Sequence, residues 1–227
     1  MSENVKKPTS PRQRYRVQNR EEIKRLATEQ LARSGPAGIS LSRIAGRMGF
    51  TAPALYRYFA NRDELITELI VDAYEDLATA VEAAVEEGSE PRHQLGELAG
   101  AVRRWVLAHP HRYLLIAGAP LPGYRAPERT TESARRVLGP FVAVFARLPR
   151  DPGTGLDRQF QHWLETDDAA GDWVRTYHGD AAALRAAVSA WSRMHGVLSL
   201  ELQGNFGGMD FDPELLFVTE VMALAGG

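Results

Sequence analysis

The chain has 227 residues, which is long enough to bury a sizeable core in one domain or in two tightly packed ones. A hydrophobic content of 44% and a charged content of 25% are typical of a globular protein. The absence of Cys excludes disulfides and thiolate metal sites, and no apolar run approaches the ~20 residues that span a bilayer. The polar N-terminus lacks the apolar core of a signal peptide, so we expect a soluble, cytoplasmic protein with no membrane partner.

The net charge of −2 hides an uneven distribution along the chain. Residues 1–62 hold 13 Lys and Arg against 4 Glu, a balance of +9, whereas residues 63–227 have a balance of −11. A basic block on an otherwise acidic chain is what binding to nucleic-acid phosphates requires. The alternative is a solvated basic tail, because a run of like charge alone usually means no more than that.

The expected elements are helices, beginning close to the N-terminus. Residues 1–16 contain two Pro and a cluster of four cations. We expect a flexible basic arm there, which could follow a DNA backbone or minor groove, or could be inert. Apolar residues with helical spacing predict a first helix over 17–33, and Ser40 can cap a second helix that starts at Leu41.

The turn after this second helix is the most informative part of the sequence. Ala45 is small where two helices would touch, and Gly49 lacks the Cβ that would hinder a sharp turn. Thr51 can cap the next helix and Pro53 is tolerated in its first turn, so a helix is expected as far as Phe59. This order predicts a helix-turn-helix, whose second helix lies in the DNA major groove; an ordinary pair of antiparallel helices is the alternative.

Residues 55–65, Leu-Tyr-Arg-Tyr-Phe-Ala-Asn-Arg-Asp-Glu-Leu, favour the DNA-binding interpretation. This run closely resembles the signature of the TetR family of transcriptional repressors, and the resemblance extends over about residues 19–69. In that family, the positions that match Tyr56, Tyr58 and Arg62 usually contact phosphate. Tyr58 stands where the family most often has His, and Arg62 where it most often has Lys; both substitutes can still donate a hydrogen bond to phosphate.

Exposed residues near the start of the recognition helix are the candidates to contact base edges. Arg57 is the best candidate to bind guanine, through a bidentate contact worth ~1–3 kcal/mol of discrimination. Small neighbours could touch thymine methyl groups, and polar residues at the start of the second helix could hold phosphates, whereas each Tyr could instead pack inside the small domain. The predicted DNA-binding set is Ser40, Ser42, Arg43, Thr51, Ala52, Pro53, Ala54, Tyr56, Arg57, Tyr58 and Arg62.

Beyond this region, Asn61 can cap a long fourth helix, which we expect to end near Glu87. Breaks rich in Gly and Pro separate the later helices, and Pro140 is expected to kink or split the helix that contains it. These later helices are expected over 94–108, 111–117, 128–147, 160–177, 180–203 and 213–225. The predicted fold is all-α, with an N-terminal three-helix helix-turn-helix domain over 17–62 and a C-terminal helical ligand-binding and dimerisation domain over 63–227.

Trp191, His195 and Gly196 form the pattern Trp-x-x-x-His-Gly, which resembles the C-terminal domain of a TetR-family subgroup with a Trp-His-Gly signature. The resemblance implies a small-molecule effector in a cavity between the fourth and eighth helices, where His195 could bond the effector or be a structural histidine. Aromatic side chains could line this cavity, although such residues often form core instead. The candidates are Trp105, Tyr113, Phe141, Phe145, Trp163, Trp191 and His195.

The last two helices are predicted to form a homodimer interface, as a four-helix bundle across a two-fold axis. The candidate interface residues are Leu184, Val188, Leu198, Leu202, Leu215, Val218, Val221 and Met222. Such a dimer would bind the two half-sites of a near-palindrome in double-stranded operator DNA. An effector that prefers a conformation with the wrong separation of recognition helices would lower operator affinity.

Other chemistry has little support in the sequence. His109 and His111 flank a Pro without a third ligand at useful spacing, and no nucleotide loop or nucleophile elbow accompanies the acidic pair Asp167 and Asp168. We therefore expect no metal, no cofactor and no enzymatic activity. The prediction is a TetR-like repressor released from its operator by a small apolar or amphipathic effector. The alternatives are an all-α enzyme or small-molecule-binding protein with an incidental helix-turn-helix, and a constitutive DNA-binding protein without inducer.

Overall fold

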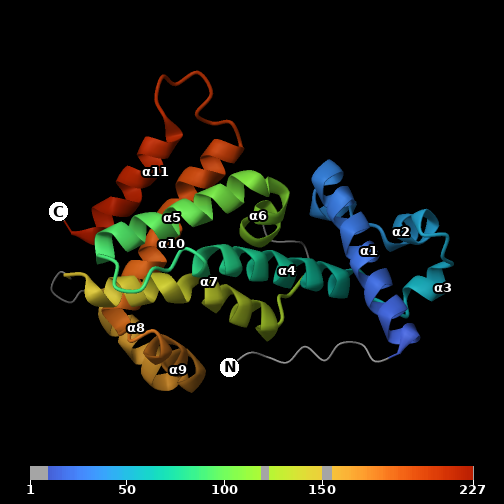
Figure 1. Cartoon of the computed structure of the whole chain (residues 1–227), viewed down its shortest axis with the longest axis horizontal. Coiled ribbons are helices and arrows are strands. Elements are labelled where there is room, and N and C mark those ends of the chain that lie inside the picture. Colours follow the sequence, from blue (N-terminus) through green and yellow to red (C-terminus); the bar gives the residue numbers. More distant parts are fainter. Residues whose placement is uncertain (1–9, 119–122, 150–154, 227) are drawn as a thin grey trace. The chain divides into compact units, whose positions relative to one another are not determined.

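The computed structural model describes residues 10–118, 123–149 and 155–226, and within these ranges every regular element is a helix (Figure 1). The predicted all-α class is therefore confirmed. The chain forms two compact units. The N-terminal unit comprises the residues up to Asp72 together with His111–Pro127, and the C-terminal unit comprises Ala73–Pro110 and the residues from Glu128 onward. No helix in the described ranges is long and apolar enough to cross a membrane.

The N-terminal unit contains the helices on which the predicted DNA-binding residues lie. These are α1 (Pro11–Ser34), the 3₁₀ turn η1 (Pro36–Gly38), α2 (Leu41–Arg47), α3 (Ala52–Leu55), the first half of α4 (Arg62–Glu82), and α6 (Pro110–Ala117). Helical spacing brings apolar side chains of α1 to α4 together in one core. Its members, none more than 3% exposed, include Ile23, Leu26, Leu31, Ile44, Leu55, Leu65 and Ile66.

Helix α1 begins at Pro11, six residues earlier than the sequence predicted. Ser10 and Gln13 form a capping box, in which each side chain accepts a hydrogen bond from the backbone N–H of the other residue. Pro11 fits the first turn because the N–H that it lacks would be unpaired there in any case. The predicted flexible arm over 1–16 is therefore wrong for residues 11–16, which are helical, while residues 1–9 lie outside the described ranges.

The C-terminal unit contains the second half of α4 and the remaining helices. These are α5 (Pro91–Ala108), α7 (Glu128–Arg147), α8 (Gly155–Thr166), α9 (Asp168–Thr176), α10 (Ala181–Leu202) and α11 (Pro213–Met222), followed by the 3₁₀ turn η2 (Ala223–Ala225). Helix α10 packs against α7, α8 and α11, and α5 packs against α7 and α11 (Figure 1). The fully buried side chains at their centre include Leu98, Val102, Phe141, Phe145, Leu184, Leu198 and Phe217.

Three helices of the C-terminal unit differ from the prediction. Helix α4 ends at Glu82 and not near Glu87, because the N–H groups of Ala84 and Val85 donate to carbonyls three residues back and Gln94 bonds the backbone of Ala84 and Glu86. Pro140 does not split α7, which runs without a break through it; the missing N–H removes one helical hydrogen bond, while the buried apolar face on both sides keeps the helix in place. The single helix predicted over 160–177 is instead two helices. Asp167 ends the first and caps the second, because its carboxylate accepts a hydrogen bond from the N–H of Ala170 at 2.9 Å.

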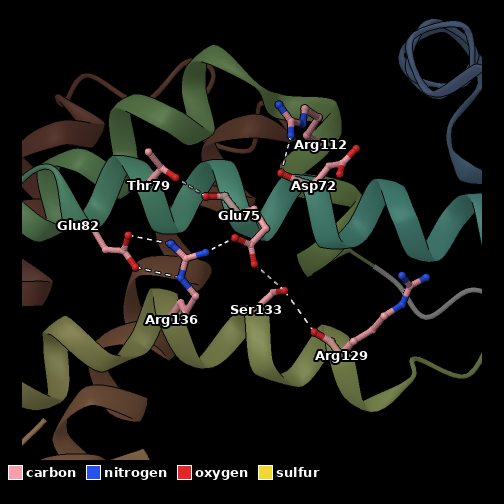
Figure 2. A network of polar contacts seen from close by, with 8 residues as sticks. All are labelled: Asp72, Glu75, Thr79, Glu82, Arg112, Arg129, Ser133 and Arg136. Atoms are coloured by element: carbon pink, nitrogen blue, oxygen red, sulfur yellow. Dashed lines mark hydrogen bonds and ion pairs between the residues drawn. The ribbon is translucent and has the colours of Figure 1, made fainter. Parts of the chain in front are cut away.

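A polar network joins the second half of α4 to α7 (Figure 2). The guanidinium of Arg136 on α7 forms ion pairs with Glu75 and Glu82 of α4. Ser133, one turn before Arg136, donates a hydrogen bond to the carboxylate of Glu75 at 3.0 Å. Because Glu75 and Glu82 are two turns apart on one face of α4, the single guanidinium fixes the alignment of α4 against α7.

Candidate nucleic-acid interface

The predicted turn between α2 and α3 is present and has the predicted cause. Gly49 adopts φ of +66°, a conformation that L side chains rarely adopt. The N–H of Phe50 then donates to the carbonyl of Ala45 at 2.9 Å, which closes the turn. Ser40 caps α2, because its hydroxyl accepts a hydrogen bond from the N–H of Arg43 at 3.4 Å. Local sequence signals therefore determine where α2 begins and how the chain turns after it.

The recognition helix is shorter than predicted. Regular α-helix covers only Ala52–Leu55, and a tighter turn follows, in which the N–H of Tyr58 donates to the carbonyl of Leu55 at 2.8 Å. Thr51 occupies the position before the helix, as predicted, but its side chain makes no capping hydrogen bond. The predicted extent as far as Phe59 is thus wrong, although Leu55 and Phe59, four residues apart, are both buried, at 1% and 0% exposure, as the apolar face predicted.

Most of the predicted DNA-contacting residues of this region face solvent, either on the short helix or directly beside it in the chain. Thr51, Ala52, Pro53 and Arg57 are exposed, and so is Tyr56, with 52% of its surface accessible. Ala54 is half-buried, so its methyl group is less available than the sequence suggested. The buried Leu55 anchors this exposed face to the core of the unit, which is the arrangement that presents side chains to a groove.

Tyr58 is held from several sides. Its hydroxyl accepts a hydrogen bond from the side-chain amide of Asn19 at 2.8 Å, and its ring stacks on Phe50 with 6.0 Å between centroids. A guanidinium N–H of Arg20 donates to its backbone carbonyl. An accepting hydroxyl keeps its own proton for a second partner, so Tyr58 can still donate to phosphate.

Arg62 has internal partners that the sequence did not indicate. Its guanidinium donates from Nε to the carbonyl of Ile39 at 3.2 Å, and from a terminal nitrogen to the carbonyl of Pro36 at 2.6 Å. These bonds tie the first turn of α4 to the segment that leads into α2. Arg62 therefore positions the helix-turn-helix, and its predicted contact with phosphate stays a prediction.

Polar side chains at the start of α2 also bond to one another. The hydroxyls of Ser40 and Ser42 lie 3.0 Å apart, and Arg43 donates to the carbonyl of Gly38. Ser42 and Arg43 are exposed, whereas Ser40 is half-buried. Ser40 is thus occupied as a cap, and Ser42 and Arg43 have the accessible polar groups of this set.

Sequence reasoning missed Arg20. Its guanidinium donates to the carbonyl of Tyr58, lies 4.2 Å above the centre of the Phe59 ring, and pairs with Glu68 at 3.3 Å. These partners follow Arg20 by 38 residues or more, so no local spacing could have indicated them. Arg20 joins α1, the end of the recognition turn and α4 within the N-terminal unit.

The structure does not bring the seven predicted effector contacts into one pocket. Tyr113 belongs to the N-terminal unit, and Phe141 and Phe145 have 0% and 1% exposure, so they offer no surface to a cavity as well as none to solvent. Trp105 is also buried, at 7%, and Trp163 lies on the surface at 39%. These five side chains are therefore core or surface in this conformation.

The remaining two candidates lie one helical turn apart on α10. Trp191 lines a cavity of about 100 Å³, whose other walls come from α4 and α7. His195 is half-buried, with its ring nitrogens 3.4 and 3.5 Å from the hydroxyl of Ser199. Contact between an effector and either residue stays a prediction.

The predicted dimer residues divide between core and surface. Leu184, Leu198 and Val221 are each 1% exposed, so they pack inside the protomer and their assignment to an interface is wrong. The cause is that α10 has neighbours on several sides within its own unit. Leu215 and Val218 of α11 are 67% and 48% exposed, and the half-buried members are Val188, Leu202 and Met222.

Comparison with known proteins agrees with this geometry. Residues 23–69 match the family described as bacterial regulatory proteins, tetR family, and residues 95–224 match the one described as tetracyclin repressor-like, C-terminal domain. HTH-type transcriptional regulator Rv1816 of Mycobacterium tuberculosis is 35% identical over 223 residues, which cover 92% of each chain. The subgroup with the Trp-His-Gly signature stays a prediction.

Solved structures give the same result. The crystal structure of SCO4313 has 46% sequence identity and a TM-score of 0.79, covering 96% of this chain and 100% of that one. A tetR-family transcriptional regulator from Streptomyces coelicolor shares the fold at 18% identity, with a TM-score of 0.60 over 92% of this chain and 79% of that one. In the described ranges, no group of three or more acidic or His side chains could hold a metal ion. The chain belongs to the TetR family of bacterial transcriptional regulators.

Proposed function

We propose that the protein is a homodimeric repressor, which binds a near-palindromic operator and is released from it by a small-molecule effector. The observation that carries the proposal is the exposed face of α3, which stands on the buried Leu55 within a basic block of net charge +9. Such a face meets base edges, while the surrounding cations attract the phosphates. The protein acts in the cytoplasm, where operator DNA is accessible, and we propose no catalytic role.

Each exposed or half-buried residue of this region has a proposed role. Arg57 binds guanine, and the methyl groups of Thr51 and Ala52 touch thymine. Tyr56, Tyr58, Ser42 and Arg43 hold phosphates and so set the orientation on the duplex. Pro53 and Ala54 support the helix at its start and its inner side.

Arg57→Ala tests the base contact. Double-stranded DNA selected from a random pool by the wild-type protein supplies the probe for fluorescence anisotropy at 0.15 M salt. The proposed dimer loses two such contacts, one in each half-site, so a loss of ~1–3 kcal/mol for each predicts roughly 30- to 25,000-fold weaker binding. Arg158→Ala is the control, because Arg158 is an exposed Arg on α8, outside the helix-turn-helix. An equal effect of both variants would refute a specific role for Arg57.

The dimer interface is proposed for the surface of α10 and α11. Two large exposed apolar side chains, Leu215 and Val218, lie one turn apart on α11, and exposed apolar clusters commonly mark interfaces. The double change Leu215→Glu, Val218→Glu should halve the mass measured by light scattering and leave the helical content unchanged. Leu156→Glu, at a 48% exposed Leu of α8, is the matched control. A double variant that stays dimeric would show that the interface lies elsewhere.

Effector control is proposed to act through α4, because the residues of this helix belong to both units. We keep as a proposal the functional division that the sequence predicts, with DNA binding in 17–62 and effector binding and dimerisation in 63–227. An effector that binds the C-terminal unit more tightly when the protein is free of DNA lowers operator affinity. The factor by which it does so equals the ratio of the effector's affinities for the DNA-free and the DNA-bound protein. Operator affinity that no small molecule changes would favour the constitutive alternative.

A further inference from the structure

We propose that the effector binds in a pocket beneath the segment that joins α4 to α5, and that it is a small, neutral, largely apolar molecule with one hydroxyl or carbonyl group. The inference rests on the proposed effector control and assigns its site and ligand class. The joining segment, residues 83–90, is called the α4–α5 connection here, and the space beneath it the connection pocket. This pocket has a volume of about 220 Å³ and lies wholly within the C-terminal unit.

The inner surface of the connection pocket is apolar. Val144 of α7, at 4% exposure, and the buried Pro140 form its floor, and Val85 of the α4–α5 connection, at 49% exposure, adds apolar surface. Ala143 is small and half-buried, and leaves space where a larger residue would fill the pocket. An apolar surface that faces a water-accessible hollow gains free energy when an apolar ligand covers it.

The outer wall is the α4–α5 connection itself, which is fastened at both ends. Gln94, only 3% exposed, donates to the carbonyl of Ala84 at 2.8 Å and accepts from the N–H of Glu86 at 2.7 Å. Arg147 donates to the carbonyl of Ser89 at 2.7 Å. Because the connection directly follows the last turn of α4 at Glu82, a ligand that pushes this wall acts on the end of α4.

The charged groups that line the connection pocket determine which chemical class of ligand it favours. Glu86 and Glu87 line it and are exposed, against one cation, Arg147, so a carboxylate ligand meets net repulsion. Tyr177 also lines the pocket, and its pKa is raised chiefly by burial, so its hydroxyl is neutral and can donate. An ammonium group would lose its hydration against the apolar floor. A hydroxyl or carbonyl group, accepting from Tyr177 or Arg147, meets none of these costs.

Two other spaces fit a ligand less well. The cavity beside Trp191, at about 100 Å³, has less than half the volume. A pocket of about 210 Å³ in the N-terminal unit is lined by charged groups that already pair, since Lys24 forms ion pairs with Glu21 at 2.9 Å and Asp72 at 2.8 Å. A ligand there would first have to break these pairs.

A matched pair of variants on α7 tests the site. Ala143→Phe fills the connection pocket, and Ala134→Phe fills the cavity beside Trp191; both replace a half-buried Ala of the same helix. The probes are cyclohexanol, cyclohexanecarboxylate and cyclohexylammonium, which share one ring and differ in the polar group. Saturation-transfer NMR titrations of the full-length protein measure Kd, and thermal melts monitored by circular dichroism confirm folding.

Cyclohexanol should bind the wild type and Ala134→Phe with the same Kd, and Ala143→Phe at least tenfold more weakly. Cyclohexanecarboxylate and cyclohexylammonium should each bind the wild type at least threefold more weakly than cyclohexanol does. If Ala143→Phe does not fold, Val85→Trp blocks the pocket from a side chain that is 49% exposed. No binding of cyclohexanol, loss of binding only in Ala134→Phe, or tighter binding of the carboxylate overturns the proposal.

Operator anisotropy with and without cyclohexanol separates this inference from the proposed function. Binding in the pocket with unchanged operator affinity would leave the site in place and refute effector control through it. Absence of cyclohexanol binding in a wild-type protein that still binds its operator would refute the site and leave the DNA-binding function in place.

Discussion

Arg62 tests how the helix-turn-helix is held together, because the family resemblance and the structure assign it different roles. The resemblance implies a contact with phosphate, whereas the structure gives its guanidinium two backbone carbonyls, those of Pro36 and Ile39. Arg62→Met removes both hydrogen bonds and retains an unbranched apolar stem of similar length. Without them, the segment that leads into α2 loses its attachment to the first turn of α4.

The size of the effect follows from these contacts. A hydrogen bond to a charged group contributes ~1.5–3 kcal/mol when it is well buried. Arg62 is half-buried and its longer bond measures 3.2 Å, so we expect a loss of about 2 kcal/mol for the pair. That free energy corresponds to roughly 30-fold faster hydrogen exchange in α2, if exchange follows local opening.

Hydrogen exchange detected by mass spectrometry on peptides that cover 36–48 is the appropriate assay. Tryptophan fluorescence would not report on this unit, since the chain has four Trp and all lie in the C-terminal unit: Trp105, Trp163, Trp173 and Trp191.

Operator binding as a function of salt then separates the two roles. Each lost phosphate contact lowers the slope of log K against log salt by about 0.9, so loss of one contact in each protomer of the proposed dimer would lower it by about 1.8. Arg62→Lys keeps the charge but cannot reach both carbonyls with one planar group, so it should lose protection in α2 and keep the slope. Unchanged protection in Arg62→Met, together with a lower slope, would refute the positioning role and support the phosphate contact.

Two further changes test the C-terminal unit. Arg136→Met removes the ion pairs with Glu75 and Glu82. Because these side chains are 40–42% exposed, the loss should be only about 0.5–1 kcal/mol, or a melting temperature lower by roughly 1–4 °C. The difference should disappear in 1 M NaCl, and a drop that persists there would point to packing instead of charge. The pKa of Glu90, which caps α5, is lowered by hydrogen bonds from the backbone N–H groups of His93 and Arg92. The stabilisation of α5 by the Glu90 carboxylate is therefore complete above the pKa that Glu90 has in the unfolded chain. It is lost as pH falls through the lower pKa that Glu90 has in the folded protein. The amide shift of His93 in NMR spectra should follow this titration and should not do so in Glu90→Gln; a shift that persists in Glu90→Gln would assign it to another group.

Features that depend on neighbouring residues were predictable from the sequence. The cap at Ser40, the turn at Gly49 and the start of a helix after Thr51 were all predicted, because a hydroxyl before a helix and a residue without Cβ act over three or four positions, whereas the end of that helix at Leu55 was not. The all-α class was predictable for the same reason, since apolar residues with helical spacing recur along the chain. The family resemblance also rests on such a run of consecutive residues, 55–65.

Contacts between groups far apart along the chain were not predictable from local patterns. Arg62 and its carbonyl partners are 23 and 26 residues apart, and Tyr58 and Asn19 are 39 apart, so nothing in the local pattern pairs them. The last two helices show the same limit. An apolar stripe predicts that a face is buried, but not whether it is buried in its own protomer or against another molecule. Leu198 is 1% exposed and Leu215 is 67% exposed, because the neighbours of α10 and α11, and not their sequences, determine which faces are covered.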